Sequence, residues 1–322
     1  MHRAFMCGYL FRHSLTQKWL PPYQKMPIKY LSFPLIATLV WAFNTIVSKL
    51  SAGAIDPGVI SFDRLLLAGL IMTPFMAQKA WANRATALNH LPKIIIFSFL
   101  GMVLFQSLAY YAAASTSATN MGLIGSLMPL NTMLFSTLLL KERPTPLLVV
   151  GVALSIFGIL ILVTKGQPLN LMNQGIAIGD GLMLIGTIAY GAYSVLLRKW
   201  AVPLHPWQML YMQIMLATLM LLPVYLLSPN SPITPENLPL VLFAGIFSSI
   251  IASFFWMQGV IHLGANRAML FMNLLPVFVA LFAVVALNEK LHVFHIVGGL
   301  VTLSGVLLAE LPKLCRTTPT NR

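Results

Sequence analysis

A stripe of aromatic and polar side chains runs along one face of the apolar segment 31–50. Trp41, Asn44 and Ser48 lie at i, i+3 and i+7, which places them on one helix face. An indole beside an amide offers a stacking surface and a hydrogen-bonding group, which suits an organic solute held in a mostly apolar cavity. Packing between helices is the alternative, because Trp41 lies too deep in its segment for an interfacial aromatic belt.

Comparable side chains occur in three other apolar segments, 93–114, 175–197 and 238–261. Trp256 and Gln258 are two residues apart and therefore face different directions on a helix, so only one of them is expected to face a cavity. In the segment 175–197, Tyr190, Tyr193 and Ser194 form a stripe similar to the one in 31–50. Asn131, Gln213 and Asn273 suit substrate contact and interhelical hydrogen bonding equally. The further predicted substrate contacts are Gln106, Tyr110, Tyr190, Tyr193 and Trp256.

Charged residues inside apolar segments are costly in a bilayer and therefore indicate function. Arg64 is interpreted as a contact for a substrate carboxylate or as an outer gate. Asp63 and Asp180 are candidates for proton coupling, although Asp180 also suits a helix N-terminus. The alternative for Asp63 and Arg64 is a position near the outer interface. Lys49 ends the preceding segment on that side, which predicts a Lys49–Asp63 ion pair.

Two glutamates and two prolines have structural interpretations. Glu142 and Glu289 each follow the last apolar residue of a segment and are expected to fix the turn into the next one. Pro129 and Pro276 lie mid-segment, where the missing N–H kinks a helix and provides a hinge or shapes a cavity. No metal-ligand spacing or cofactor motif is found, and we expect neither metal nor cofactor.

Composition determines the setting of these residues. Of the 322 residues 58% are hydrophobic and 8% charged, against roughly 25% charged in a soluble domain. Mean hydropathy is +0.83, and the apolar residues form blocks of about 20, the length that crosses a bilayer. We predict an all-α polytopic membrane protein with ten transmembrane helices, at 31–50, 56–78, 93–114, 118–140, 146–164, 175–197, 206–227, 238–261, 265–287 and 292–311. Its 18 methionines and many aromatic residues favour amphipathic organic solutes over bare ions.

The basic residues are unevenly distributed between alternate loops. One set of loops, with both tails, holds most of the 20 Lys and Arg, whereas the other set holds only Lys49, Lys165 and Lys290. The positive-inside rule therefore places both termini in the cytoplasm, as tails at 1–28 and 312–322. This distribution also explains the net charge of +13 without nucleic-acid binding.

The two halves of the chain resemble each other. Laying 118–164 on 265–311 pairs Pro129 with Pro276 and Glu142 with Glu289. Halves at 29–165 and 174–311 each hold five predicted spans, an odd number, so they must be inverted relative to one another. Inverted repeats are typical of secondary transporters with a substrate site near the midplane. The alternative is that duplication only builds a stable bundle.

Several of these motifs resemble EamA-type carriers of the drug/metabolite transporter superfamily. The resemblance rests on Leu39-Val40-Trp41-Ala42-Phe43-Asn44 with Lys49, on Phe62-Asp63-Arg64, on Ala118-Thr119-Asn120 through Pro129 to Glu142, and on Ala265-Asn266-Arg267 through Pro276 to Glu289. It covers about residues 31–311. It implies a carrier of five plus five inverted helices for metabolites such as amino acids, often an exporter, in the plasma membrane (a bacterial inner membrane).

Other functional classes have less support. A passive channel or a membrane assembly factor is the alternative, and a membrane-embedded enzyme is less favoured because no catalytic cluster accompanies His292 and His295. No P-loop motif is present. Small residues at Gly151, Ser155 and Gly158 recur at Gly298, Thr302 and Gly305. They allow close helix packing, either between the halves or in a homodimer. The expected partners are a small-molecule substrate and the lipid bilayer.

Overall fold

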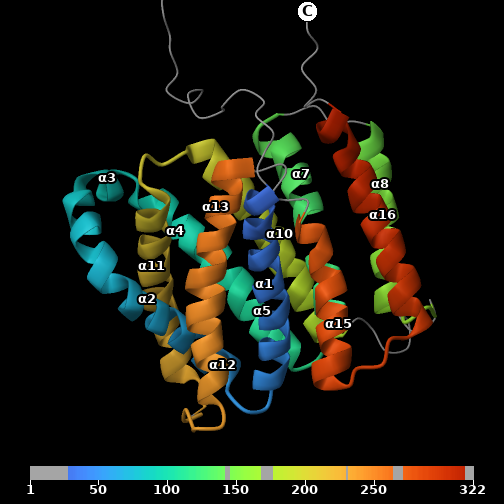
Figure 1. Cartoon of the computed structure of the whole chain (residues 1–322), viewed down its shortest axis with the longest axis horizontal. Helices are drawn as coiled ribbons and strands as arrows, with labels where there is room; N and C mark the ends of the chain where they lie inside the picture. The colour runs from blue at the N-terminus through green and yellow to red at the C-terminus, as the bar shows by residue number, and fades with distance from the viewer. Residues whose placement is uncertain (1–27, 142–145, 168–176, 230, 264–270, 316–322) are drawn as a thin grey trace, which may run out of the picture.

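The computed structural model describes residues 28–141, 146–167, 177–229, 231–263 and 271–315, and the regular structure in these ranges is helical (Figure 1). The α-helices are α1 Ser32–Ser51, α2 Pro57–Ala82, α3 Arg84–Asn89, α4 Leu91–Phe97, α5 Phe105–Ala113, α6 Ala118–Gly125, α7 Met128–Leu139, α8 Pro146–Val163, α10 Ile178–Trp200, α11 Pro206–Leu227, α12 Leu238–Leu242, α13 Ser253–Leu263, α15 Leu275–Leu287 and α16 Val293–Cys315. The 3₁₀-helices are η1 Ile28–Leu31 and η4 Phe271–Leu274, and the π-helices are η2 Ser98–Leu104 and η3 Phe243–Ala252.

Seven helical stretches in the described part are long and apolar enough to cross a bilayer. They are Ser32–Ser51, Pro57–Ala82, Leu91–Ala113, Ala118–Leu139, Ile178–Trp200, Pro206–Leu227 and Leu238–Gly259. Three shorter apolar helices, Val149–Leu162, Phe271–Leu287 and Val293–Ala309, lie within the other predicted spans. The predicted all-helical, polytopic fold is therefore confirmed, whereas the count of ten crossings stays a prediction.

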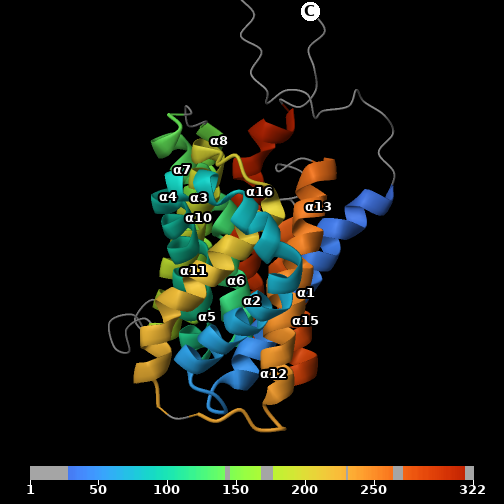
Figure 2. The same ribbon diagram turned by 90° about the vertical axis from the view of Figure 1, so that its left-hand side faces the viewer.

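The two ends of the bundle differ in charge. Helix α1 begins and α16 finishes at the same end (Figure 1). We call this the base-rich end, because Lys79, Lys93 and Arg198 lie near it at the termini of α2, α4 and α10. The opposite, base-poor end carries Lys49, in the last turn of α1, and Lys165, just after α8. Figure 2 shows α1, α13 and α15 on one side of the bundle, with α5, α10 and α11 on the other.

Small residues bring α8 and α16 into close contact. A Cβ atom added to Gly158 would lie 2.5 Å from the Thr302 backbone N and 2.7 Å from the Gly298 oxygen. The Ser155 hydroxyl donates to the Thr302 carbonyl at 3.1 Å. The two small-residue stripes therefore pack against each other within one chain. A homodimer stays a prediction, and this face is not available to it.

Both predicted mid-span prolines lie where a helix is interrupted. Pro129 is in the first turn of α7, and α6 ends just before it at Gly125. Pro276 is likewise in the first turn of α15, directly after the 3₁₀-helix η4. Proline suits a first helical turn, where its missing N–H is not needed. Hinge motion at these two breaks remains a prediction.

The glutamate that ends the second repeat has a different partner from the one expected. Its own hairpin was the predicted contact, but the Glu289 carboxylate accepts hydrogen bonds from the backbone N–H groups of Ala118 at 2.8 Å and Thr119 at 3.1 Å. It also accepts the Thr119 hydroxyl at 2.7 Å. Glu289 therefore caps the N-terminus of α6, where a negative charge is favourable. Its counterpart Glu142 lies outside the described residues.

Candidate functional site

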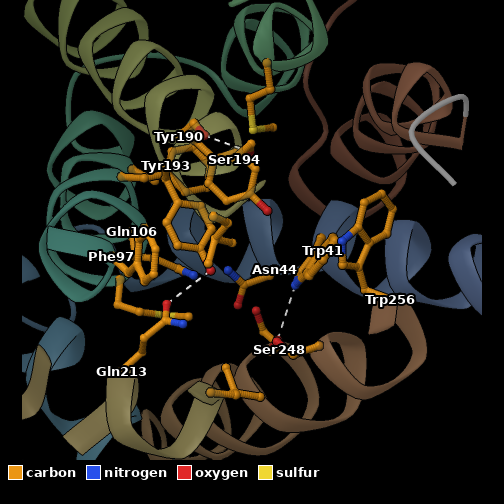
Figure 3. Close-up of a pocket in the computed structure, with 18 of the residues that line it drawn as sticks. Trp41, Asn44, Phe97, Gln106, Tyr190, Tyr193, Ser194, Gln213, Ser248 and Trp256 are labelled. Atoms are coloured by element: carbon orange, nitrogen blue, oxygen red, sulfur yellow. Dashed lines mark hydrogen bonds between the residues drawn. The ribbon is translucent and has the colours of Figure 1, made fainter. Parts of the chain in front are cut away.

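A cavity of about 590 Å³ occupies the centre of the bundle (Figure 3). Its wall comes from both sides seen in Figure 2: α1, α13 and α15 on one, α5, α10 and α11 on the other. Its size is within the range of sites for small organic molecules. The structure brings all eight predicted substrate contacts into this wall: Trp41, Asn44, Arg64, Gln106, Tyr110, Tyr190, Tyr193 and Trp256.

One wall of the cavity is formed by a pair of indoles. The Trp41 ring lies 5.5 Å from the Trp256 ring at an interplanar angle of 53°. The Trp41 indole N–H donates to the Ser248 carbonyl at 3.2 Å, which fixes the ring against the π-helix η3. Trp256 rather than Gln258 faces the cavity. Rigid, oriented indoles form an apolar stacking surface with little loss of side-chain entropy on binding.

The opposite wall is formed by tyrosines of α10. The rings of Tyr190 and Tyr193 lie 5.4 Å apart, and the Tyr193 hydroxyl donates to the Gln213 side-chain oxygen at 3.1 Å. A Cβ atom added to Gly101 would lie 3.0 Å from the Tyr193 ring, so glycine lets the ring approach η2. Gln213 therefore both lines the cavity and joins two helices.

Asn44 lies between the two aromatic walls. Figure 3 shows Tyr193 and Gln106 on one side of it, with Trp41 and Trp256 on the other. The Asn44 Oδ1 atom is buried and has no hydrogen-bond partner among the described residues. A buried polar atom without a partner costs free energy that a ligand donor recovers. Asn44 is thus placed to hydrogen-bond a molecule in the cavity.

Arg64 marks the part of the cavity nearer the base-poor end. Its side chain is 1% exposed. It donates through Nη2 to the Ser249 hydroxyl at 2.8 Å and through Nη1 to the Tyr110 hydroxyl at 3.4 Å. Its guanidinium carbon also lies 5.6 Å from the centre of the Tyr110 ring. Arg64 is therefore a cation buried within the helix bundle.

The two predicted coupling residues lie outside the cavity wall. Asp63 is partly exposed on α2. Asp180 is buried at the start of α10, where it accepts hydrogen bonds from the Thr116 hydroxyl and from the Asn120 side-chain amide at 3.3 Å. The predicted Lys49–Asp63 ion pair is wrong. The Lys49 ammonium instead donates to two backbone carbonyls, that of Ala113 at the end of α5 at 2.8 Å and that of Thr116 at 2.7 Å.

The described wall residues that are exposed to solvent, Arg198, Ala201 and Pro206, lie at one end of the cavity. Arg198 lies in the last turn of α10, Ala201 follows that helix and Pro206 begins α11, all at the base-rich end. At the other end, buried Arg64 and Tyr110 are followed by a polar cluster of Lys49, Thr116, Asn120 and Asp180, which we call the closed-end cluster. The cap made by Glu289 on α6 lies at the same end.

Part of the wall was not predicted residue by residue. Phe97 and Phe105 extend the aromatic surface, with ring contacts to Tyr193 at 6.1 Å and to Tyr190 at 4.9 Å. The richness of the sequence in methionine did indicate an adaptable apolar cavity, but not which residues form it. The methionines in the wall are Met102, Met121, Met128, Met183, Met209, Met257 and Met272.

The fold and the site together define a polytopic helical membrane protein with a central cavity, an architecture suited to a carrier of small molecules. The chain belongs to the EamA-like transporter family, whose pattern matches residues 28–164 and again residues 177–311.

Of three relatives of similar length, two carry transporter names. An uncharacterized transporter of Archaeoglobus fulgidus is 27% identical over 85% of this chain and 94% of its own. The uncharacterized transporter YyaM of Bacillus subtilis is 25% identical, with 82% and 88% covered. The protein PecM of Dickeya dadantii is also 25% identical, with 88% and 93% covered. A crystal structure with 18% identity shares the fold, with a TM-score of 0.59 over 90% of this chain and 99% of the other.

Proposed function

We propose that this protein is a secondary transporter that exports a small organic metabolite, such as an amino acid or a related compound. Ten helices in two inverted halves, 29–165 and 174–311, cross a bacterial inner membrane with both termini in the cytoplasm. The central cavity, whose exposed wall residues lie at one end while Arg64 and Tyr110 are buried toward the other, carries this proposal. Alternating access requires such a one-sided site near the midplane.

The positive-inside rule gives this state a direction. The exposed wall residues of the cavity lie at the base-rich end, and we therefore interpret this state as an inward-open carrier ready to load substrate from the cytoplasm. Release outside requires the closed-end cluster to part while the region around Ala201 closes. The helix breaks at Pro129 and Pro276 and the π-helices η2 and η3, which lie in corresponding spans, supply the joints for this exchange.

Proton coupling is proposed for Asp180 rather than for Asp63. Asp180 belongs to the cluster that must separate for outward opening, and its carboxylate accepts the hydrogen bonds that join Thr116 and Asn120 to α10. Protonation removes the charge that strengthens these bonds. Exchange of the outer proton for substrate is therefore expected to require Asp180, and Asp180→Asn is expected to remove the dependence of transport on a pH gradient.

Counterflow into proteoliposomes tests the carrier function. Candidate solutes are first found by thermal stability of the purified protein, since a ligand at about 100 times its Kd stabilises it by about 2.7 kcal/mol. A carrier then accumulates labelled solute against an unlabelled pool and saturates. Solute flux without saturation or counterflow would support the passive channel instead. A well-folded protein with no ligand and no flux would favour the assembly factor.

The same ligand assay tests the cavity residues. Trp41→Ala removes one indole of the wall, and Asn44→Ala removes the unpartnered acceptor. Each substitution is expected to raise the apparent Kd of the ligand at least tenfold. Phe75→Ala is the matched control, because Phe75 is an aromatic residue of α2 that is 69% exposed and lies outside the cavity wall. Equal ligand affinity in Trp41→Ala and Phe75→Ala would contradict the assignment of the ligand site to this cavity wall.

A further inference from the structure

The charged side chains in the cavity wall have one sign. Among the described residues the wall contains Arg64 and Arg198 and no Asp, Glu or Lys. The remaining wall is formed by aromatic, aliphatic, methionine, small and amide side chains. A positive potential in a low-dielectric pocket favours an anionic ligand over a neutral or cationic one.

Arg64 lacks the partner that a buried cation requires. Of its five N–H donors, two bond the neutral hydroxyls of Ser249 and Tyr110, and Nε is buried without a hydrogen-bond partner. No described carboxylate forms an ion pair with it. Asp63 does not fill this place, because adjacent helical residues diverge by about 100° and Asp63 lies outside the wall. A guanidinium inside a membrane protein is ordinarily paired.

We propose that the transported substrate is an organic carboxylate, whose anionic group binds Arg64 while its apolar body lies between the tryptophan and tyrosine walls. A guanidinium presents paired N–H groups that match a carboxylate bidentately. Ser249 and Tyr110 hold two of its nitrogens in place. This inference rests on the proposed function, since it names the substrate class of the same cavity.

A pair of near-isosteric probes tests the charge requirement. 3-Phenylpropionate and 3-phenylpropionamide differ in one group, and 3-phenylpropylamine adds a cation of similar shape. With the purified full-length protein, the acid is expected to bind about tenfold or more tightly than either probe, as charged hydrogen bonds predict. Equal binding of the acid and the amide, or the absence of binding by the acid, would overturn the proposal.

Substitutions at Arg64 test whether this residue causes the preference for the acid over the amide. Arg64→Gln is expected to reduce the preference of the acid over the amide to about twofold or less, whereas Arg64→Lys keeps part of it because the charge remains. A preference that survives in Arg64→Gln would place the anion site elsewhere. Melting temperatures without ligand check folding. If Arg64→Gln does not fold, the wild-type probe pair and Arg64→Lys still decide the outcome.

Counterflow separates this inference from the proposed function. If the acid binds with dependence on Arg64 but loaded vesicles show no counterflow with any solute, the carrier function fails and the anion site stands. If vesicles show saturable counterflow of a neutral or cationic solute, with no preference for acids in binding, the carrier stands and the carboxylate inference is wrong.

Discussion

Replacing Gly158 by alanine is expected to destabilise the protein by about 1–3 kcal/mol, the usual cost of inserting a methyl group into a closely packed contact. The added carbon would meet the hydroxyl of Thr302 and backbone atoms of α16, including the Gly298 oxygen at 2.7 Å. Backbone atoms cannot rotate away, so α8 and α16 must separate. The loss should appear as a lower midpoint in thermal unfolding in detergent.

Gly181→Ala provides the control for this substitution. Gly181 is also helical, in α10, and a Cβ atom placed there meets nothing within 4 Å. Alanine at such a site should leave stability unchanged or raise it by about 0.5–1 kcal/mol, because glycine weakens helices. Equal destabilisation by Gly158→Ala and Gly181→Ala would contradict the packing argument and indicate a general intolerance to change in these helices.

The second large effect is expected from Glu289→Ala. This change removes the acceptor for the Ala118 and Thr119 amides and for the Thr119 hydroxyl. Leaving buried or partly buried donors unpaired costs about 1–3 kcal/mol. The Ser117 hydroxyl still caps one further N–H of α6, so the helix should fray rather than unfold. Hydrogen exchange of the peptide that carries Ala118 and Thr119 should become faster.

Two variants separate the effect of the charge at Glu289 from the effect of losing any carboxylate. Glu289→Gln keeps an acceptor without the charge, so its effect should be smaller than that of alanine. Glu236→Ala removes another carboxylate, an exposed one in the loop before α12, and should change stability by no more than about 0.5 kcal/mol. If Glu236→Ala matched Glu289→Ala, general loss of negative charge rather than the α6 cap would account for the effect.

The cavity residues could be predicted because residues spaced three or four apart in the sequence lie on one face of a helix. Trp41 and Asn44, three residues apart, or Gln106 and Tyr110, four apart, must point the same way. Deep polar residues in an apolar segment usually face a partner or a cavity. Periodicity therefore identifies the inward face, although it does not reveal which side chains across the cavity will meet.

Pairings between distant segments could not be read from the sequence. The sequence pairs Lys49 with Asp63 because both lie toward the same predicted side of the membrane, but Lys49 bonds carbonyl groups at the end of α5 and after it. Glu289 was assigned to its own hairpin, yet its partners are about 170 residues earlier in the chain. The π-helices were not predicted, because no residue type indicates a π-helical turn as clearly as proline indicates a helix break.

The contact between α8 and α16 also constrains how the protein is made. Ser155 and Thr302, which bond across it, are separated by 147 residues, and α16 is the final described helix. Until α16 has been synthesised, the small-residue face of α8 must contact lipid or another segment of the protein. Assembly therefore finishes only after α16 has been synthesised and has packed on α8, and nascent chains that stop before α16 leave this face of α8 exposed to quality control.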